Sequence, residues 1–170
     1  MGVAFFDARM NPDQEREREQ AVRASGALLL NGNPELQALV ENARREFGTT
    51  MAAVSILHED WQYLLAAAGL PSGVYSRRAS ICAHAITRPE RVFCVPDLGR
   101  DPRFADMPGD ADDVSVGFYA GATLLDQNRV ALGAFCVFDP SARPMLTRDE
   151  AARLYEYAKS AMSVIRYHQG

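Results

Sequence analysis

The residues with the most direct routes to chemistry in this 170-residue sequence are three cysteines and three histidines. Cys82 lies near a predicted helix start, with Arg77 and Arg78 upstream and His84 two residues further on. A helix N-terminus or a nearby cation lowers the pKa of a thiol and makes it a better nucleophile. A cysteine in such a place is more commonly a small buried hydrophobic residue, and this is our interpretation of Cys82 and of Cys136.

The spacing of these residues does not favour metal or haem ligation. Two positions along a helix correspond to about 200° of rotation, so Cys82 and His84 cannot both face one ion. The sequence contains neither a Cys-x-x-Cys nor a His-x-x-x-His pair, which are spacings typical of metal sites. We therefore interpret His84 as a structural histidine and predict no metal and no cofactor.

Asp97, Asp101 and Arg103 form a second set that could do acid–base chemistry or bind phosphate. However, Asp101 precedes a proline, which is typical of a helix start, and Asp97 follows one, which is a common turn position. We expect Arg103 to pair with one of these carboxylates. Three aromatic residues lie in or next to the same irregular stretch, where they would pack in the core or line a pocket: Phe104, Phe118 and Tyr119.

The elements that must position these residues follow from caps and periodicity. Asn11-Pro12 and Asn33-Pro34 are helix start signals, and Thr147 with Glu150 forms a capping box for a C-terminal helix. The predicted elements between them are strands 51–57, 62–68, 91–95, 116–125 and 130–139 and a short helix at 82–86. This order predicts an α+β fold in which helices pack on one face of an antiparallel sheet.

The composition is that of one globular domain, since 48% of the residues are hydrophobic and 24% are charged. A formal charge of −4 argues against binding to a nucleic-acid backbone. No apolar run approaches the roughly 20 residues that a membrane helix needs. The N-terminus lacks the features of a signal peptide, and three widely spaced cysteines do not make a disulfide framework. We therefore expect a cytoplasmic domain with no nucleic-acid or membrane partner.

Three strings of sequence stand out: residues 80–86 (SICAHAI), residues 95–106 (VPDLGRDPRFAD), and residues 117–122 with 132–139 (GFYAGA and LGAFCVFD). In this order they resemble a GAF domain of the subgroup found beside histidine kinases and diguanylate cyclases. The resemblance places a GAF domain at residues 25–168 after an N-terminal extension and helix at 1–24. One departure is Thr123, where this subgroup usually has proline, and we expect it to adjust a strand without changing the fold.

The resemblance implies a GAF-like (PAS-like) sheet of six antiparallel strands. The N- and C-terminal helices would pack on one face, and a loop-lined cavity would lie on the other. The residues that would line this cavity are Cys82, His84, Asp97, Arg103, Phe104, Phe118 and Tyr119. The function implied is a stand-alone bacterial sensory module that binds a small cytoplasmic ligand non-covalently. It would signal, without catalysis, through a separate protein or through its own dimer.

The sequence disfavours several other branches of the family. The reductases have their catalytic cysteine in the loop before the fifth strand, but residues 110–115 contain no cysteine. No Cys-His pair is present for covalent bilin attachment, and no Asn-Lys pair opens the signature of the cyclic-nucleotide binders. Two alternatives stay open. One is a thiol redox enzyme or sensor, similar to methionine sulfoxide reductases, that uses Cys82 with Cys94. The other is a structural dimerisation module with a collapsed cavity.

The C-terminal helix has more apolar surface than packing against a sheet requires. A helical wheel places one stripe toward the sheet, consisting of Ala151, Leu154, Tyr155, Ala158, Ala161, Met162 and Ile165. Tyr157 and Val164 lie beyond the edge of this stripe, and the first helix has a narrow apolar stripe of its own. We therefore predict a homodimer formed through the terminal helices, which the resemblance also implies. The candidate interface residues are Val22, Leu29, Tyr157, Ala161 and Val164.

Overall fold

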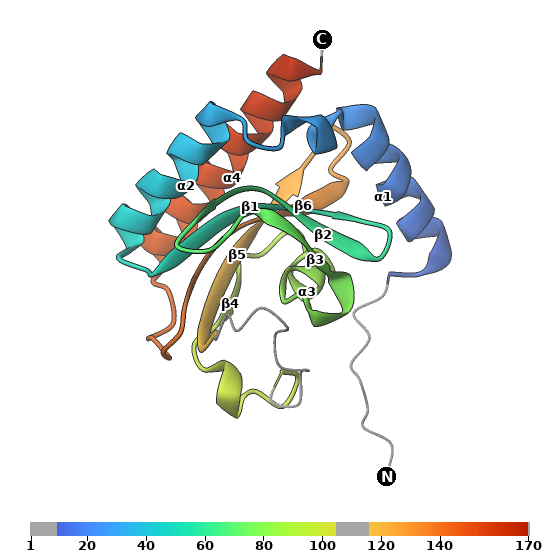
Figure 1. Ribbon diagram of the computed structural model, residues 1–170. Coiled ribbons are helices and arrows are strands. Elements are labelled where there is room, and N and C mark those ends of the chain that lie inside the picture. The colour runs from blue at the N-terminus through green and yellow to red at the C-terminus, as the bar shows by residue number, and fades with distance from the viewer. Residues whose placement is uncertain (1–9, 105–115, 170) are drawn as a thin grey trace.

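The computed structural model describes residues 10–104 and 116–169. Its centre is an antiparallel sheet of six strands in the order β3-β2-β1-β6-β5-β4 (Figure 1). The strands are β1 (Met51–His58), β2 (Trp61–Ala68), β3 (Gly73–Ser76), β4 (Phe93–Val95), β5 (Phe118–Leu125) and β6 (Ala131–Asp139). The helices are α1 (Pro12–Ser25), α2 (Pro34–Phe47), α3 (Cys82–Ala85) and α4 (Arg148–His168). Short 3₁₀ turns are η1 (Ala27–Leu30), η2 (Arg77–Ala79) and η3 (Leu98–Arg100).

The predicted caps are present at the ends of the long helices. The side chains of Asn11 and Asn33 accept hydrogen bonds from backbone amides in the first turns of α1 and α2. Thr147 and Glu150 form the predicted capping box of α4. Gly48 ends α2 in the left-handed conformation, which glycine adopts without a steric penalty. These local signals set where the helices begin and end.

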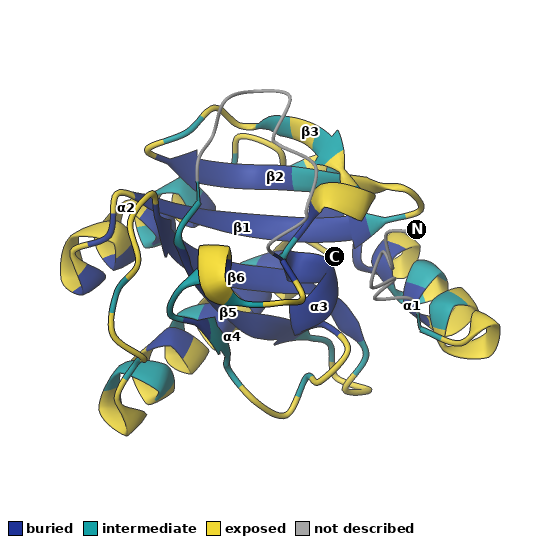
Figure 2. Ribbon diagram, turned by 90° about the horizontal axis from the view of Figure 1, so that it is seen from below, coloured by how far each residue is buried: buried dark blue, intermediate teal, exposed yellow. Residues whose placement is uncertain are grey.

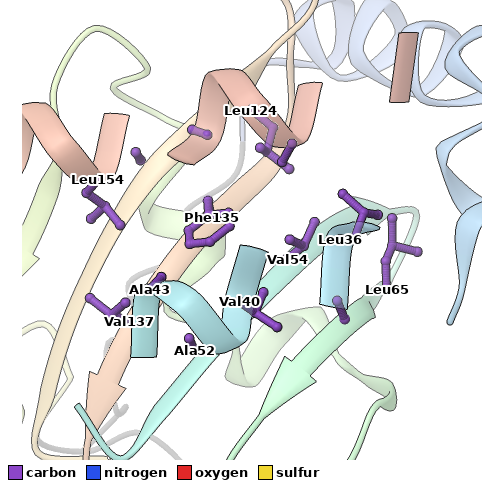
Figure 3. Close-up of a cluster of buried hydrophobic side chains, with 14 of the residues drawn as sticks. Leu36, Val40, Ala43, Ala52, Val54, Leu65, Leu124, Phe135, Val137 and Leu154 are labelled. Atoms are coloured by element: carbon purple, nitrogen blue, oxygen red, sulfur yellow. The ribbon is translucent and has the colours of Figure 1, made fainter. Parts of the chain in front are cut away.

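The sheet separates two hydrophobic layers. On one face, which we call the helix side, Leu36 and Val40 of α2 and Leu154 of α4 pack against Val54 and Phe135 of the sheet (Figure 3). On the other face, which we call the loop side, α3 and the connections before and after β4 cover the strands. β6 is buried along its whole length (Figure 2), as expected of a central strand that is covered on both faces.

A buried arginine attaches α1 to the ends of β1 and β6. The Arg18 side chain is 1% exposed, and its Nη1 donates to the Leu57 carbonyl oxygen at 2.5 Å. Its Nη2 also lies 3.1 Å from a Glu15 carboxylate oxygen and 2.9 Å from a Glu19 oxygen. Arg77, the first residue of η2, pairs with the same Glu15 carboxylate. The N-terminal helix is therefore held to the sheet mainly by charged groups rather than by a broad apolar face.

Both predicted hairpins are confirmed, and each strand end lies within two residues of its prediction. The predicted strand at 91–95 is confirmed over the shorter range of β4. The residue pattern did not predict β3, because it is four residues long and lies at an edge of the sheet with half of its residues exposed. Thr123 lies within β5, where its hydroxyl contacts the Ala85 carbonyl oxygen at 3.4 Å, so this departure left the strand in place.

The helical wheel of α4 was wrong about which tyrosine faces the core. Tyr155, expected to face the sheet, is 38% exposed. Tyr157, expected beyond the edge, stacks on Phe135 with the ring centroids 5.3 Å apart and lies 6.3 Å from Phe47. The reason is that α4 packs against α2 as well as against β5 and β6, which turns its buried face toward α2.

Candidate functional site

Four ring side chains gather on the loop side and form what we call the aromatic cluster: His84, Phe93, Phe104 and Tyr119. The His84 ring meets Phe104 edge-on with centroids 4.6 Å apart and is stacked with Phe93 at 6.4 Å. Phe93 in turn meets Tyr119 edge-on at 6.2 Å. These residues come from α3, β4, the segment after η3, and β5, so the cluster joins elements that are distant in sequence.

Arg103 extends this cluster with a charged group. Its guanidinium carbon lies 5.2 Å from the centre of the Phe93 ring and 5.3 Å from that of Phe104. Asp101 binds the guanidinium with both carboxylate oxygens, at 3.0 Å from Nε and 2.6 Å from Nη2. The predicted pairing of Arg103 is therefore confirmed. The hydrogen bond from Arg103 lowers the pKa of Asp101, and the carboxylate raises the pKa of Arg103.

His84 contributes a neutral polar edge to the cluster. Burial is the main reason that the pKa of His84 falls to about 4; the charge of Arg103 lowers it further, whereas Asp101 raises it. At neutral pH the imidazole is therefore uncharged, with one ring nitrogen as a donor and one as an acceptor. The side chain is 8% exposed, so this polar edge belongs to the interior of the loop side.

A second cluster lies beneath α3 and consists of Cys82, Cys136, Tyr119, Ser55 and Ser80, which we call the thiol cluster. The Tyr119 hydroxyl donates to Cys82 Sγ at 3.0 Å, and the sulfur atoms of Cys82 and Cys136 are 3.9 Å apart. The pKa of Cys82 is lowered to about 7. The hydrogen bond with Cys136 is the largest cause, and the hydroxyls of Tyr119, Ser55 and Ser80 lower the pKa further, whereas burial raises it. Cys82 and burial raise the pKa of Cys136. Cys82 is therefore the residue of the pair that ionises first.

Five of the seven predicted cavity residues come together on the loop side: Cys82, His84, Arg103, Phe104 and Tyr119. Phe118 does not, and its assignment to the cavity was wrong. It is 1% exposed in the helix-side core, because successive residues of a strand point to opposite faces and Tyr119 faces the loop side. Asp97 precedes η3, where a carboxylate oxygen lies 3.7 Å from Arg100.

Cys94 lies on the opposite face of the sheet from Cys82, so the predicted pairing of these two cysteines was wrong. Cys94 packs against the helix-side core, and its neighbours Phe93 and Val95 face the loop side. The sulfur that faces Cys82 belongs to Cys136, which we had interpreted only as a buried hydrophobic residue. The resemblance gave no signal for this pair, since the two cysteines are 54 residues apart.

Sequence reasoning also missed Phe93 and did not foresee the role of Ser55. The alternation of β4 places Phe93 on the same face as Val95, and this signal could have found it. The loop at 110–115, which we used to disfavour reductase chemistry, lies outside the described residues. The loop-lined cavity itself stays a prediction, because the loop-side residues that the structure describes pack closely on one another.

The interface candidates fall into two groups. Val22 is 1% exposed and Ala161 is fully buried, so both pack inside the monomer and have no surface to offer a second copy. Tyr157 and Val164 are half-buried against the helix-side core, whereas Leu29 is 88% exposed. A surface groove of about 260 Å³ lies between α1 and the C-terminal half of α4, beside the turn between β5 and β6.

Residues 10–104 and 116–169 contain no group of three His, Cys, Asp or Glu side chains arranged to hold a metal ion. Within the same ranges, no helix combines the length and apolar character needed to cross a membrane. The loop side therefore combines ring faces, one paired guanidinium, a neutral imidazole and a pair of thiols.

The six-stranded antiparallel sheet, with α2 and α4 on one face and α3 with its loops on the other, is the GAF fold. The GAF domain of an Acinetobacter phosphoenolpyruvate-protein phosphotransferase superposes with a TM-score of 0.65 over 94% of this chain and 95% of that one, at 16% identity. The GAF domain of Thermosynechococcus elongatus PixJ gives 0.62 over 94% and 91%, at 13% identity. A type II free methionine-R-sulfoxide reductase of Thermoplasma acidophilum gives 0.54 over 91% and 96%, at 13% identity.

Among curated proteins, a cyclic di-GMP phosphodiesterase of Pseudomonas aeruginosa is 34% identical over 154 residues. The alignment covers 91% of this chain but only 26% of that relative, so the chain spans about a quarter of its length. No family model matches the sequence. The structural likenesses therefore establish the fold, and the sequence of this chain is similar to one part of a longer cyclic di-GMP phosphodiesterase.

Proposed function

We propose that this chain is a cytoplasmic sensory domain that binds a small molecule on its loop side and performs no catalysis of its own. The observation that carries the proposal is the aromatic cluster, in which the rings of His84, Phe104 and Tyr119 lie around that of Phe93 and a guanidinium is held over the Phe93 and Phe104 rings. Ring faces with a few convergent polar groups are typical of small-molecule sites. Domains of this fold occur in signalling proteins, which supports a regulatory role.

The charges of the site favour a flat ligand with polar edges and little net charge. Asp101 neutralises Arg103, and His84 is uncharged at neutral pH, so the cluster has no unpaired ionic charge among these three groups. The imidazole and the guanidinium would hydrogen-bond to the ligand. The rings would stack on its faces, which is worth on the order of 1 kcal/mol per aromatic contact beyond simple burial.

The relative from Pseudomonas suggests what the domain regulates. Because that protein is a cyclic di-GMP phosphodiesterase and this chain matches only a quarter of it, we propose that ligand binding here controls cyclic di-GMP signalling. The control would act on a further domain or a separate signalling protein. The chain itself would then neither make nor hydrolyse the messenger.

Ligand binding is tested on freshly purified protein by native mass spectrometry and an absorption spectrum, which detect a co-purified molecule. A thermal-shift screen with nucleotides, cyclic dinucleotides and aromatic metabolites covers ligands that are lost on purification. We expect a hit that Arg103→Gln weakens by at least tenfold and that Arg100→Gln leaves unchanged. Arg100 is the matched control because its side chain is 90% exposed on the same segment and outside the cluster. Equal binding by both variants, or no binder in either assay, would contradict the proposal.

Non-catalytic function has its own test. We expect no turnover of free methionine sulfoxide with a dithiol donor, and no hydrolysis of cyclic di-GMP with magnesium or manganese. Measurable turnover that purifies with the protein and is lost in Cys82→Ser would support the thiol enzyme instead.

We also propose a homodimer whose contact includes Leu29. This residue is 88% exposed in η1, and Tyr167 near the end of α4 is 80% exposed. The end of α4 lies beside the segment that follows η1, since His168 Nε2 lies 3.4 Å from the side-chain nitrogen of Asn33. We expect light scattering to give a dimer for the wild type and for Met145→Glu, an exposed control, but a monomer for Leu29→Glu. A wild-type monomer at high micromolar concentration would contradict this.

A further inference from the structure

The two thiols beneath α3 are placed as a reactive pair. Cys82 is the first residue of α3, and Cys136 lies near the centre of β6. Their sulfur atoms are 3.9 Å apart. Both residues are at most 2% exposed and both are free thiols. A sulfur–sulfur bond is about 2.05 Å long. A shift of roughly 2 Å in the single-turn helix would therefore bring them to bonding distance.

The surroundings of Cys82 favour its anionic and oxygenated forms. The Tyr119 hydroxyl donates to Cys82 Sγ at 3.0 Å, and the Gln62 side-chain amide reaches it at 3.8 Å. Within residues 10–104 and 116–169, the hydroxyls of Ser55 and Ser80 are buried beside the same sulfur and have no hydrogen-bond partner within normal distance. Buried donors without partners are costly, and a thiolate or a sulfur-bound oxygen would satisfy them.

We propose that Cys82 and Cys136 form a peroxide-reactive dithiol, in which Cys82 is the attacking cysteine and Cys136 is the resolving cysteine. The oxidant is a small hydroperoxide such as hydrogen peroxide. This modification site adjoins the ligand site in the proposed function and shares Tyr119 with it. It differs from the pairing with Cys94, which lies on the other face of the sheet.

The chemistry proceeds in two balanced steps. The Cys82 thiolate attacks one peroxide oxygen, the O–O bond breaks, and the leaving alkoxide or hydroxide takes the proton released by the thiol. Cys82 is thereby oxidised to a sulfenic acid while the peroxide is reduced to an alcohol or water. The Cys136 sulfur then attacks Cys82 Sγ, the S–O bond breaks, and hydroxide leaves with the Cys136 proton as water. The products are a Cys82–Cys136 disulfide and water.

A short route leads from the surface to Cys82. The Gln62 side chain is half-buried at the start of β2 and contacts the sulfur with its amide. α3 is only four residues long, and so short an element opens by local fluctuation more readily than a strand of the central sheet. A molecule the size of hydrogen peroxide can enter by such an opening. Bulky disulfides such as oxidised glutathione would be excluded.

The test begins with the wild-type protein, which has three cysteines. After treatment with stoichiometric hydrogen peroxide and alkylation in denaturant, we expect the free thiol count to fall from three to one. Peptide mapping should find one intramolecular bridge, between Cys82 and Cys136. In Cys94→Ser, the matched control, the same bridge should form. A bridge that contains Cys94, a bridge between chains, or three free thiols after treatment would overturn the proposal.

Variants separate the two roles. Cys136→Ser should stop at a sulfenic acid on Cys82, which dimedone traps, whereas Cys82→Ser should leave Cys136 reduced. Tyr119→Phe should slow the first step roughly tenfold because it removes a hydrogen bond to the thiolate. Tyr63→Phe, on the helix side, should not change the rate. Dimedone labelling of Cys136 in Cys82→Ser would reverse the assignment, and the wild-type map decides the pairing even where a variant fails to fold.

Discussion

Gly133 lies at the centre of the sheet, where the backbone of β6 approaches that of β1 too closely for a side chain. It pairs with Ile56 of β1 on one side and Leu124 of β5 on the other. A Cβ atom at Gly133 would overlap the Ser55 carbonyl oxygen and lie 2.8 Å from the Ser55 carbonyl carbon and 2.9 Å from Ile56 Cα. All three atoms belong to the backbone of β1, so no side-chain rotation can make room.

We expect Gly133→Ala to destabilise the protein by about 3 kcal/mol, and Gly133→Val by more. Inserting an extra carbon into a packed core costs roughly 1–3 kcal/mol, and the upper end applies because two strands of the ladder must move apart. For a domain of 150–250 residues, each kcal/mol lowers Tm by about 2–4 °C, so Tm should fall by roughly 6–12 °C.

Urea unfolding followed by far-UV circular dichroism measures this free energy, with Gly99→Ala as the control. Among the residues that the structure describes, a Cβ at Gly99 would meet only the Asp97 carboxylate, at the ordinary contact distance of 3.5 Å, so we expect a change within about 0.5 kcal/mol. If Gly133→Ala were as stable as Gly99→Ala, the close approach of β6 to β1 would be refuted.

Three further predictions concern charged and titrating groups. Arg18→Ala should cost about 3–5 kcal/mol in chemical unfolding, because it leaves buried carbonyl and carboxylate groups without their partner, whereas Arg16→Ala on the exposed face of α1 should change little. Burial raises the pKa of Glu15, but hydrogen bonds from Arg77 and Arg18 outweigh it, so the folded-state pKa lies below the usual 4.5. The stability that this lowered pKa gives is complete above pH 4.5 and declines as the pH falls further. Glu15→Gln should flatten that decline in an acid titration. His84 has a folded-state pKa of about 4, against 6.5 for the free side chain. Its neutral form therefore contributes its full stabilisation above pH 6.5, and this contribution is lost as the pH falls through 4. The imidazole NMR signal should not titrate between pH 8 and 5.5.

The sequence predicted best what depends on neighbouring residues. Helix starts follow from single capping side chains such as Asn33 and Thr147, and both hairpins follow from an apolar run, a polar turn and a second run. The partner of Arg103 was also predictable, because Asp101 is only two residues away and its side chain can reach the guanidinium directly. Interactions within a few residues need no knowledge of the rest of the fold.

Two of the wrong predictions share one physical cause: strand alternation, and not nearness in the sequence, decides which face of the sheet a side chain occupies. Phe118 and Tyr119 were both placed at the cavity, although neighbours in a strand must point to opposite sides. The same rule separates Cys94 from Cys82. The error at α4 has a different cause, since the position of α2 against this helix depends on the tertiary fold and a helical wheel contains no such information.

Strand alternation also couples the two layers through β6. Cys136 faces the thiol cluster, while its neighbours Phe135 and Val137 face the helix side, where the Tyr157 ring of α4 stacks on Phe135 at 5.3 Å. A bond between Cys136 and Cys82 must move the β6 backbone, α3 or both, and any movement of β6 is shared by Phe135 because the two residues are covalently joined. Since Tyr157 and Phe135 are in ring contact, a displacement of β6 would reach α4 directly. A single strand, β6, therefore separates the thiol cluster from α4. Tyr157 is the residue on α4 where a displacement of β6 should be measured.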